Sequence, residues 1–295
     1  MKLVYIGCVE SSSRFLQAIY KETDAHIAGI VTKAISHFNS DHVSLEQFAT
    51  EKKIDWLDYQ DKDSMIEWIK ERQPDIIYCF GWSHLLSSDV LDIPKWGIVG
   101  YHPALLPANR GRHPIIWALA LGLKKTGSTF FYLTKEADAG DILNQRIIQI
   151  EHDEDARSLY NKILKAGEEQ VVEMTKQFID ARIEATPQDH LKANYWRKRT
   201  KRDGEIDWRM STKAIIQLIR ALTKPYVGAH AVYKGADSII WKAEVSTLNP
   251  DHYTNYEPGK VIDANKNTFT VKTGDGLVVI QEHEWSELPK IGEYL

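Results

Sequence analysis

Short apolar runs that alternate with amphipathic patterns are the feature that most constrains how this chain folds. A run that is apolar at nearly every position is typical of a strand buried on both faces of a parallel sheet. Between these runs, apolar residues such as Phe15, Leu16 and Ile19 recur at helical spacing. The runs lie at residues 2–9, 27–32, 74–80 and 97–99. We therefore predict an α/β domain with a Rossmann-like, mostly parallel sheet.

The C-terminal part of the chain has a different pattern. Residues 185–205 are polar and carry a basic run, which we interpret as a linker. From residue 206 onward, short alternating segments are separated by Gly and Asn turns, a pattern typical of a small β-barrel. A chain of 295 residues has room for two domains. We expect an N-terminal domain over 1–184, a linker over 185–205 and a C-terminal domain over 206–295.

Charge and cysteine usage limit the class of protein. The formal net charge is −4, which argues against a strongly basic nucleic-acid-binding protein. Cys8 and Cys79 each lie in an apolar run, which favours buried free thiols in a reducing compartment over a disulfide. The sequence opens on a strand-like run and has no apolar run near the ~20 residues that span a bilayer. We therefore expect a cytoplasmic protein with no membrane partner.

A histidine and an aspartate follow two neighbouring apolar runs. His102 comes shortly after residues 97–99, on a loop that prolines at positions 103, 107 and 114 stiffen. Asp138 lies in the loop 136–141, after the apolar run 128–133. Loops beyond the carboxyl ends of strands bind ligands in open α/β sheets, so the two side chains can form a general acid–base pair. Spacing alone, however, favours a solvated histidine and ordinary turn chemistry.

Polar residues also follow the first two apolar runs. Ser11, Ser12 and Ser13 lie between a strand and a helix, where serine caps the helix and can also help to hold an anion. The loop 36–42 lies where a nucleotide or a sugar could be contacted, and its residues equally fit a turn. The sequence has no G-x-G-x-x-G pattern after its first strand, so a dinucleotide cofactor is not indicated.

Several separated motifs share one family resemblance. In order, they are His102-Pro-Ala-Leu-Leu-Pro, Arg110-Gly111, Pro114-Ile115, Trp117-Ala118, Thr126-Gly127-Ser128-Thr129 and Asp138-Ala-Gly-Asp141. Together they resemble the 10-formyltetrahydrofolate-dependent formyltransferases, which include methionyl-tRNA, glycinamide ribonucleotide and sugar-nucleotide formyltransferases. The specific matches span about residues 76–150, and a weaker likeness continues to the C-terminus.

The resemblance implies a formyltransferase catalytic domain followed by an OB-like domain, with 10-formyltetrahydrofolate as co-substrate. It assigns catalysis to His102 and Asp138. The residues that it places near the folate are Phe80, Trp82, Leu86, Ala137 and Asp141. The residues that it places near the acceptor are Ser11, Ser12, Ser13, Phe38, Asn39, Asp41, Tyr101, Asn109, Arg110 and Arg112. Trp82 and Leu86 either form apolar walls or simply pack. Arg110 and Arg112 suit a phosphate or a carboxylate, or are solvated.

One position departs from the family pattern. The usual catalytic trio is Asn, His and Asp, with the Asn two residues before the His, and this chain has Gly100 there. Either another donor such as Asn109 polarises the formyl oxygen, or the chain works without the amide, or its site is inactive. Protonated His102 would stabilise the oxygen that becomes negative, and Asp138 would relay protons. The sequence offers no strong metal-ligand cluster.

The loops at residues 11–13, 38–41 and 109–113 most resemble those of the sugar-nucleotide formyltransferases. The resemblance therefore favours a nucleotide-linked amino sugar as the acceptor, such as a UDP-linked 4-amino-4,6-dideoxy sugar of the pseudaminic acid pathway. Nucleic acid is the less favoured partner. Methionyl-tRNA stays the alternative acceptor, because the basic run at residues 192–202 can face phosphates, although a solvated linker explains that run equally. Gly100 also motivates an inactive folate- or nucleotide-sugar-binding protein. A hydrolase that only deformylates the folate is a further alternative. The oligomeric state stays open, with a homodimer included.

Overall fold

The computed structural model describes residues 1–36, 40–84 and 86–295, which form two compact units. The first unit comprises Met1–Pro114, Lys125–Gln149 and Asn161–Trp196. The second unit comprises Ile115–Lys124, Ile150–Tyr160 and Arg197–Leu295. The segment expected to be a linker is therefore shared between the two units, and its first half packs within the first. The domain ranges expected from the sequence stay a prediction.

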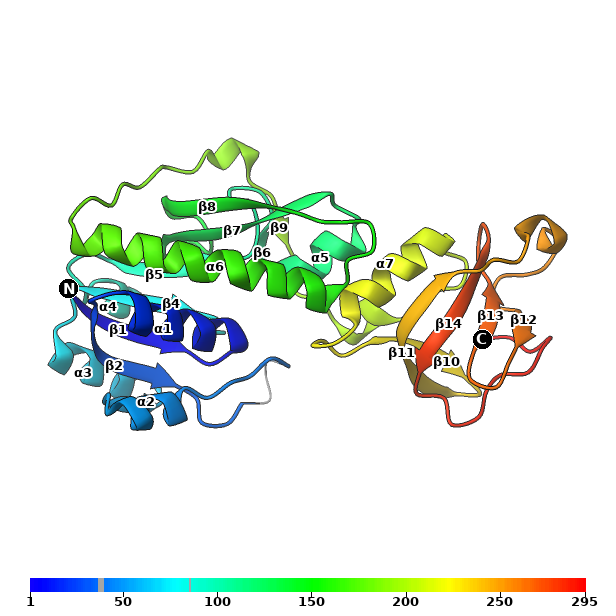
Figure 1. Cartoon of the computed structure of the whole chain (residues 1–295), viewed down its shortest axis with the longest axis horizontal. Coiled ribbons are helices and arrows are strands. Elements are labelled where there is room, and N and C mark those ends of the chain that lie inside the picture. Colours follow the sequence, from blue (N-terminus) through cyan, green and yellow to red (C-terminus); the bar gives the residue numbers. More distant parts are fainter. Residues whose placement is uncertain (37–39, 85) are drawn as a thin grey trace. The chain divides into compact units, whose positions relative to one another are not determined.

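A seven-stranded sheet organises the first unit (Figure 1). Its strand order is β3-β2-β1-β4-β5-β7-β8, and all neighbours up to β5 are parallel, whereas β7 and β8 are antiparallel. The strands are β1 (Lys2–Gly7), β2 (His26–Thr32), β3 (Trp56–Asp58), β4 (Ile76–Phe80), β5 (Ile98–His102), β7 (Lys125–Tyr132) and β8 (Ile142–Gln149). The predicted Rossmann-like, mostly parallel sheet is confirmed.

Helices cover both faces of this sheet (Figure 1). On one face, Met65 of α3 packs in an apolar cluster with Val4 of β1. On the other face, Phe15 of α1 meets Phe80 edge to face at 5.8 Å between ring centroids. The helices of the first unit are α1 (Glu10–Glu22), α2 (Glu46–Lys52), α3 (Lys62–Arg72), α4 (Ser88–Leu91) and most of α6 (Ala156–Ile179), whereas α5 (Pro114–Ala120) belongs almost wholly to the second unit. Cover on both faces explains why the strands read as continuous apolar runs.

Strand β5 carries His102 at its last position, which corrects the expectation that the strand ends at residue 99. The antiparallel ladder continues past that point, because Tyr101 pairs with Phe130 and His102 pairs with Thr129 of β7. Pro103 follows directly, and a proline cannot donate a ladder hydrogen bond. The backbone of His102 is therefore held by the sheet and not by a loop.

The second unit contains a five-stranded antiparallel sheet of order β10-β11-β14-β13-β12. Its strands are β10 (Ala229–Tyr233), β11 (Ala236–Val245), β12 (Val261–Ala264), β13 (Phe269–Lys272) and β14 (Leu277–His283). Helix α7 (Thr212–Leu222) packs against β11, and the Ser211 hydroxyl caps its start by accepting a hydrogen bond from the amide of Ala214. The predicted helix at 212–222 is confirmed, and the short C-terminal strands predicted to form a small OB-like barrel are seen as an antiparallel sheet.

The two cysteines, Cys8 and Cys79, are buried and form no disulfide. Across the residues that the structure describes, no helix combines the length and the apolarity needed to cross a membrane.

Candidate active site

His102 lies at the carboxyl end of β5 with each ring nitrogen facing a defined group. Its side chain is buried, and Nε2 lies 2.7 Å from the backbone oxygen of Asn109. Nδ1 lies 3.8 Å from Oδ2 of Asp138. Because a carbonyl oxygen can only accept, we assign a proton to Nε2. A second proton on Nδ1 would make an imidazolium that faces the carboxylate.

Asp138 lies in the loop between β7 and β8, with a backbone φ of 56°. This left-handed conformation costs most residues ~1–2 kcal/mol, although aspartate tolerates it better than most. Its Oδ2 accepts a 2.8 Å hydrogen bond from the backbone N–H of Gly111. The two residues expected to be catalytic are therefore brought together, and the 3.8 Å gap leaves Nδ1 of His102 without a direct hydrogen bond to the carboxylate.

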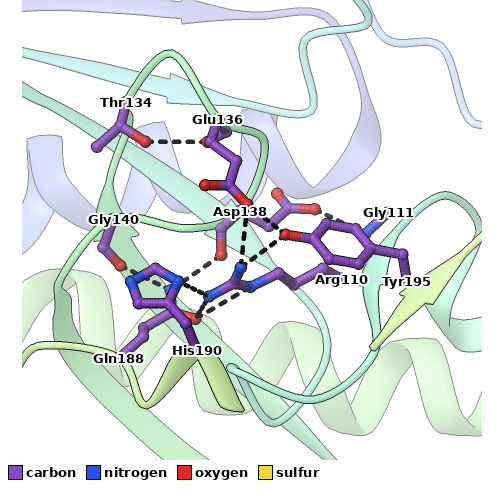
Figure 2. A network of polar contacts seen from close by, with 9 residues as sticks. All are labelled: Arg110, Gly111, Thr134, Glu136, Asp138, Gly140, Gln188, His190 and Tyr195. Carbon is purple, nitrogen blue, oxygen red and sulfur yellow. Dashed lines mark hydrogen bonds and ion pairs between the residues drawn. The ribbon is translucent and has the colours of Figure 1, made fainter. Parts of the chain in front are cut away.

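Arg110 does not fit the expectation that it holds a phosphate of the acceptor. Its side chain is only 1% exposed and lies in a network of polar contacts (Figure 2). Oε1 of Gln188 accepts from Nη2 at 2.7 Å and from Nε at 3.3 Å, and the hydroxyl of Tyr195 lies 2.7 Å from Nη1. Glu136 lies 3.5 Å from Nη1 and accepts a 2.5 Å hydrogen bond from Tyr195. Because the guanidinium is buried and already bonded to these partners, it is not accessible to a phosphate of the acceptor.

Sequence reasoning missed Gln188, His190 and Tyr195, because all three lie in the segment interpreted as a linker. Strand β9 (Tyr195–Trp196) pairs in parallel with β6 (Arg110–Gly111), whose Gly111 amide binds Asp138. His190 adds a contact of 3.3 Å between Nδ1 and Nη2 of Arg110. Two adjacent aromatic residues in an otherwise polar stretch were the one available sign that this segment packs.

Tyr101 does not line the site with His102, contrary to expectation. Successive side chains along a strand point to opposite faces of the sheet, so Tyr101 and His102 diverge. The Tyr101 ring packs against Phe15 at 4.9 Å between centroids, and its hydroxyl lies 2.9 Å from Oγ of Ser128. Burial raises the pKa of this phenol. The residue therefore belongs to the core under α1.

The serines after β1 lie inside the first turn of α1 and not in a loop before it. Ser12 is fully buried, and its hydroxyl donates to the backbone oxygen of Phe80 at 2.6 Å and accepts from the amide of Val9 at 3.3 Å. Ser13 accepts a 3.1 Å hydrogen bond from Gln17. The capping role of serine is therefore seen at Ser12, whose hydroxyl binds within the fold. Ser11 is buried as well.

The expected folate contacts differ in exposure. The Phe80 side chain is fully buried, so only its backbone can face a ligand, and its oxygen already accepts from Ser12. Trp82 is half-buried, lies edge to face with Tyr59, and its Nε1 is buried without a hydrogen-bond partner among the described residues. Leu86 packs against the apolar cluster of α3. Ala137 and Asp141 are exposed on the loop of Asp138.

The remaining expected acceptor contacts are only partly described. Phe38 and Asn39 lie outside the described residues. Asp41 is half-buried, and its backbone oxygen accepts from the amide of Glu10 at 3.0 Å. Asn109 contacts His102 through its carbonyl. Arg112 is half-buried, and its amide donates to Trp196 at 3.0 Å.

The space beside Gly100 is filled by Leu133. A Cβ atom at position 100 would lie 2.3 Å from Cδ2 of Leu133 and 3.1 Å from Cζ of Phe131. An asparagine here would require Leu133 to move. The packing of Leu133 and Phe131 therefore leaves no room for a side chain at position 100.

The chain matches two family descriptions, Formyl transferase over residues 8–175 and Formyl transferase, C-terminal domain, over residues 198–291. It is 31% identical to the methionyl-tRNA formyltransferase of Caldanaerobacter subterraneus subsp. tengcongensis over 303 aligned residues, which cover 100% of this chain and 96% of that relative.

Two solved structures share the fold. An N-formyltransferase from Helicobacter canadensis, in complex with folinic acid and dTDP-3-aminofucose, has a TM-score of 0.71 at 18% identity and covers 95% of this chain and 99% of its own. HypX from Aquifex aeolicus has a TM-score of 0.68 at 19% identity and covers 97% of this chain, which spans 46% of that protein. With matches to both family domains and a full-length relative, this chain belongs to the formyl transferase family of enzymes.

Proposed function

We propose that this enzyme transfers a formyl group from 10-formyltetrahydrofolate to a primary amine, with His102 and Asp138 as its catalytic residues. The observation that carries the proposal is the distance of 3.8 Å between Nδ1 of His102 and Oδ2 of Asp138. The pair lies at the carboxyl end of β5, the edge of the sheet where open α/β sheets bind their ligands.

The two side chains match two demands of formyl transfer. Negative charge builds on the formyl oxygen as the amine attacks, and protonated Nδ1 of His102 can donate to that oxygen. A proton must also leave the attacking nitrogen and reach the departing one, and the Asp138 carboxylate can hold it in between. The Nε2–H bond to Asn109 fixes the orientation of the imidazole ring throughout.

Residues at the end of β4 and in the loop of Asp138 fit the folate. The buried indole N–H of Trp82 has no hydrogen-bond partner among the described residues. An oxygen or nitrogen atom of a bound folate could accept a hydrogen bond from it. Ala137 and Asp141 are exposed on the neighbouring loop. We propose that these residues, with Leu86 as an apolar contact, hold the folate, which supplies the formyl group.

Methionyl-tRNA is the acceptor that the comparisons favour. The relatives that align over the whole chain at 31% and 30% identity are named methionyl-tRNA formyltransferases. The sugar nucleotide favoured by the sequence has support from the Helicobacter canadensis structure, whose 18% identity speaks for the fold alone. The comparisons thus support methionyl-tRNA, the alternative acceptor in the sequence analysis, better than a sugar nucleotide.

A nucleotide-linked amino sugar is the second candidate, and the pairing of the basic run favours it. Arg197 pairs with Asp203, and Lys201 pairs with Asp237. The guanidinium of Arg199 lies 4.6 Å from the ring centroid of Trp117. Since these cations already have partners within the second unit, tRNA phosphates would have to displace them. A cytoplasmic location and a homodimer stay predictions.

The acceptor can be decided by mass spectrometry. The purified enzyme is incubated with 10-formyltetrahydrofolate and either methionyl-tRNA or a panel of UDP-, dTDP- and GDP-linked amino sugars, with uncharged tRNA as the control. A formyl group gained by methionyl-tRNA supports the first candidate, and one gained by a sugar nucleotide supports the second. Release of formate with no formylated acceptor would contradict both and favour a hydrolase.

A further inference from the structure

Arg110 is an unusual residue to find completely buried. Arginine is almost never fully buried unless it is paired, because removing its charge from water is costly. The carboxylate of Glu136 lies 3.5 Å from its guanidinium, with 62% of the Glu136 side chain exposed. The shorter contacts come from neutral groups on Gln188 and Tyr195 (Figure 2). Packing alone does not explain why a charge is placed here.

Gln188 connects the buried arginine to the loop of Asp138. Its Oε1 accepts from Arg110, while its Nε2 donates to the backbone oxygens of Asp138 at 2.9 Å and of Gly140 at 2.6 Å. The side chain is 6% exposed. An amide is the side-chain group that can accept at one atom and donate twice at the other. Gln188 therefore ties two backbone carbonyls of the catalytic loop to a fixed cation.

Hydrogen bonds hold both the backbone and the side chain of Asp138. Gln188 binds its backbone oxygen, and the amide of Gly111 binds its carboxylate. Its positive φ is a sparsely populated conformation, which persists only where the surroundings enforce it. Losing the Gln188 contact would let the loop relax and would turn the carboxylate away from His102.

The part of the chain that contains Gln188 also supports His102. The amide of Asn109, whose carbonyl accepts from Nε2 of His102, donates to Oδ1 of Asn194 at 2.8 Å. Strand β9 follows directly and pairs with β6. The segment 186–196, which contains Gln188, Asn194 and β9, therefore contacts the supports of both catalytic side chains.

We propose that Gln188, anchored by Arg110, is a positioning residue that holds the Asp138 carboxylate toward His102. This inference rests on the proposed function for its kinetic consequence. Its structural consequence, an ordered loop at residues 134–141, applies to the free protein. The polar segment 186–196 is then a structural support of the active site.

Gln188→Glu is the most informative variant, because it keeps the shape of the side chain and strengthens its pairing with Arg110. It removes both N–H donors to the loop and sets an oxygen against two carbonyls. Arg110→Leu is less informative, since it can fail to fold. Gln149→Glu, an exposed glutamine on β8, makes the same chemical change as a matched control.

The first measurement is hydrogen exchange of the free protein. We expect Gln188→Glu to speed amide exchange in residues 134–141 at least about tenfold, with exchange in β1 and β4 unchanged. Gln149→Glu should leave the loop as in the parent protein. Unchanged exchange in the loop of Gln188→Glu would overturn the inference, whatever the reaction of the enzyme.

The second measurement is steady-state kinetics with the acceptor that the enzyme formylates. We expect Gln188→Glu to lower kcat about 10- to 100-fold, because small misplacements of a reacting group cost this much, with KM for both substrates within about threefold. An unchanged kcat, or a loss confined to KM, would overturn the positioning role. A parent enzyme that formylates no amine would contradict the proposed function, and the exchange measurement would still decide the inference.

Discussion

The backbone N–H of Gly111 donates a 2.8 Å hydrogen bond to Oδ2 of Asp138, the same oxygen that lies 3.8 Å from Nδ1 of His102. Gly111 has a φ of 102°, and a Cβ atom on it would lie 2.3 Å from the backbone oxygen of Trp196. Its lack of a side chain thus lets one backbone amide reach the carboxylate while β6 pairs with β9.

Gly111→Ala should therefore affect both stability and catalysis. The forced backbone shift would lower the free energy of unfolding by ~1–3 kcal/mol and lower kcat by weakening the Asp138 contact. Gly235→Ala is the matched control, because Gly235 has a φ of 79° with nothing within 4 Å of the added Cβ. Chemical denaturation and kinetics of both variants check this. Equal effects of the two variants on kcat would contradict it.

His102→Gln tests the proposed catalytic role of His102 with little change in side-chain volume. Without an imidazolium to face the reacting oxygen, kcat should fall by about 10²- to 10⁴-fold, the range that general acid–base groups contribute. The control is His26→Gln, an exposed histidine at the start of β2. Full activity of His102→Gln, with a fold verified by circular dichroism, would remove His102 from the mechanism.

Gly100→Asn tests whether Leu133 fills the space that the family's asparagine side chain would need at position 100. The new side chain would overpack against Leu133 and lower the free energy of unfolding by ~1–3 kcal/mol. The double variant Gly100→Asn with Leu133→Ala should be less destabilised than the sum of its single variants, because the second change makes room. A sum that is strictly additive in urea denaturation would show that the two positions do not compete for space.

The buried thiols should make stability fall at alkaline pH. Burial raises the pKa of the Cys8 thiol to about 11 from its ordinary value of 9, and burial also raises that of Cys79. Folding therefore favours the protonated thiols, so their contribution to stability is complete below pH 9 and is lost as the pH rises toward 11. In urea denaturation, Cys8→Ala should lose less stability between pH 8 and pH 10.5 than the parent protein. An equal loss would contradict this assignment.

The parallel sheet could be predicted because strands such as β1 and β4 are apolar at nearly every position, a pattern that is local in the sequence. Helix 212–222 could also be predicted from a local pattern, the helical spacing of its apolar residues, and its capping Ser211 precedes it directly. His102 and Asp138 were found from family motifs, and their spacing alone favoured ordinary turn chemistry.

The network around Arg110 could not be predicted, because its contacts join residues far apart in the chain. Arg110 and Gln188 are 78 positions apart, and nothing local distinguishes Gln188 from a solvated linker residue. Tyr101 is a different case, since strand alternation predicts that it faces away from His102 once β5 is known to include both residues.

The most direct test of the account follows a ¹³C-labelled formyl group from 10-formyltetrahydrofolate to the acceptor by NMR, in the parent enzyme and in Asp138→Asn. The asparagine can still accept from Gly111 and cannot hold the proton, so transfer should be at least about 100-fold slower than in the parent enzyme. Asp24→Asn, an exposed aspartate, should match the parent. Equal transfer rates for Asp138→Asn and the parent enzyme would contradict the central claim that His102 and Asp138 carry formyl transfer.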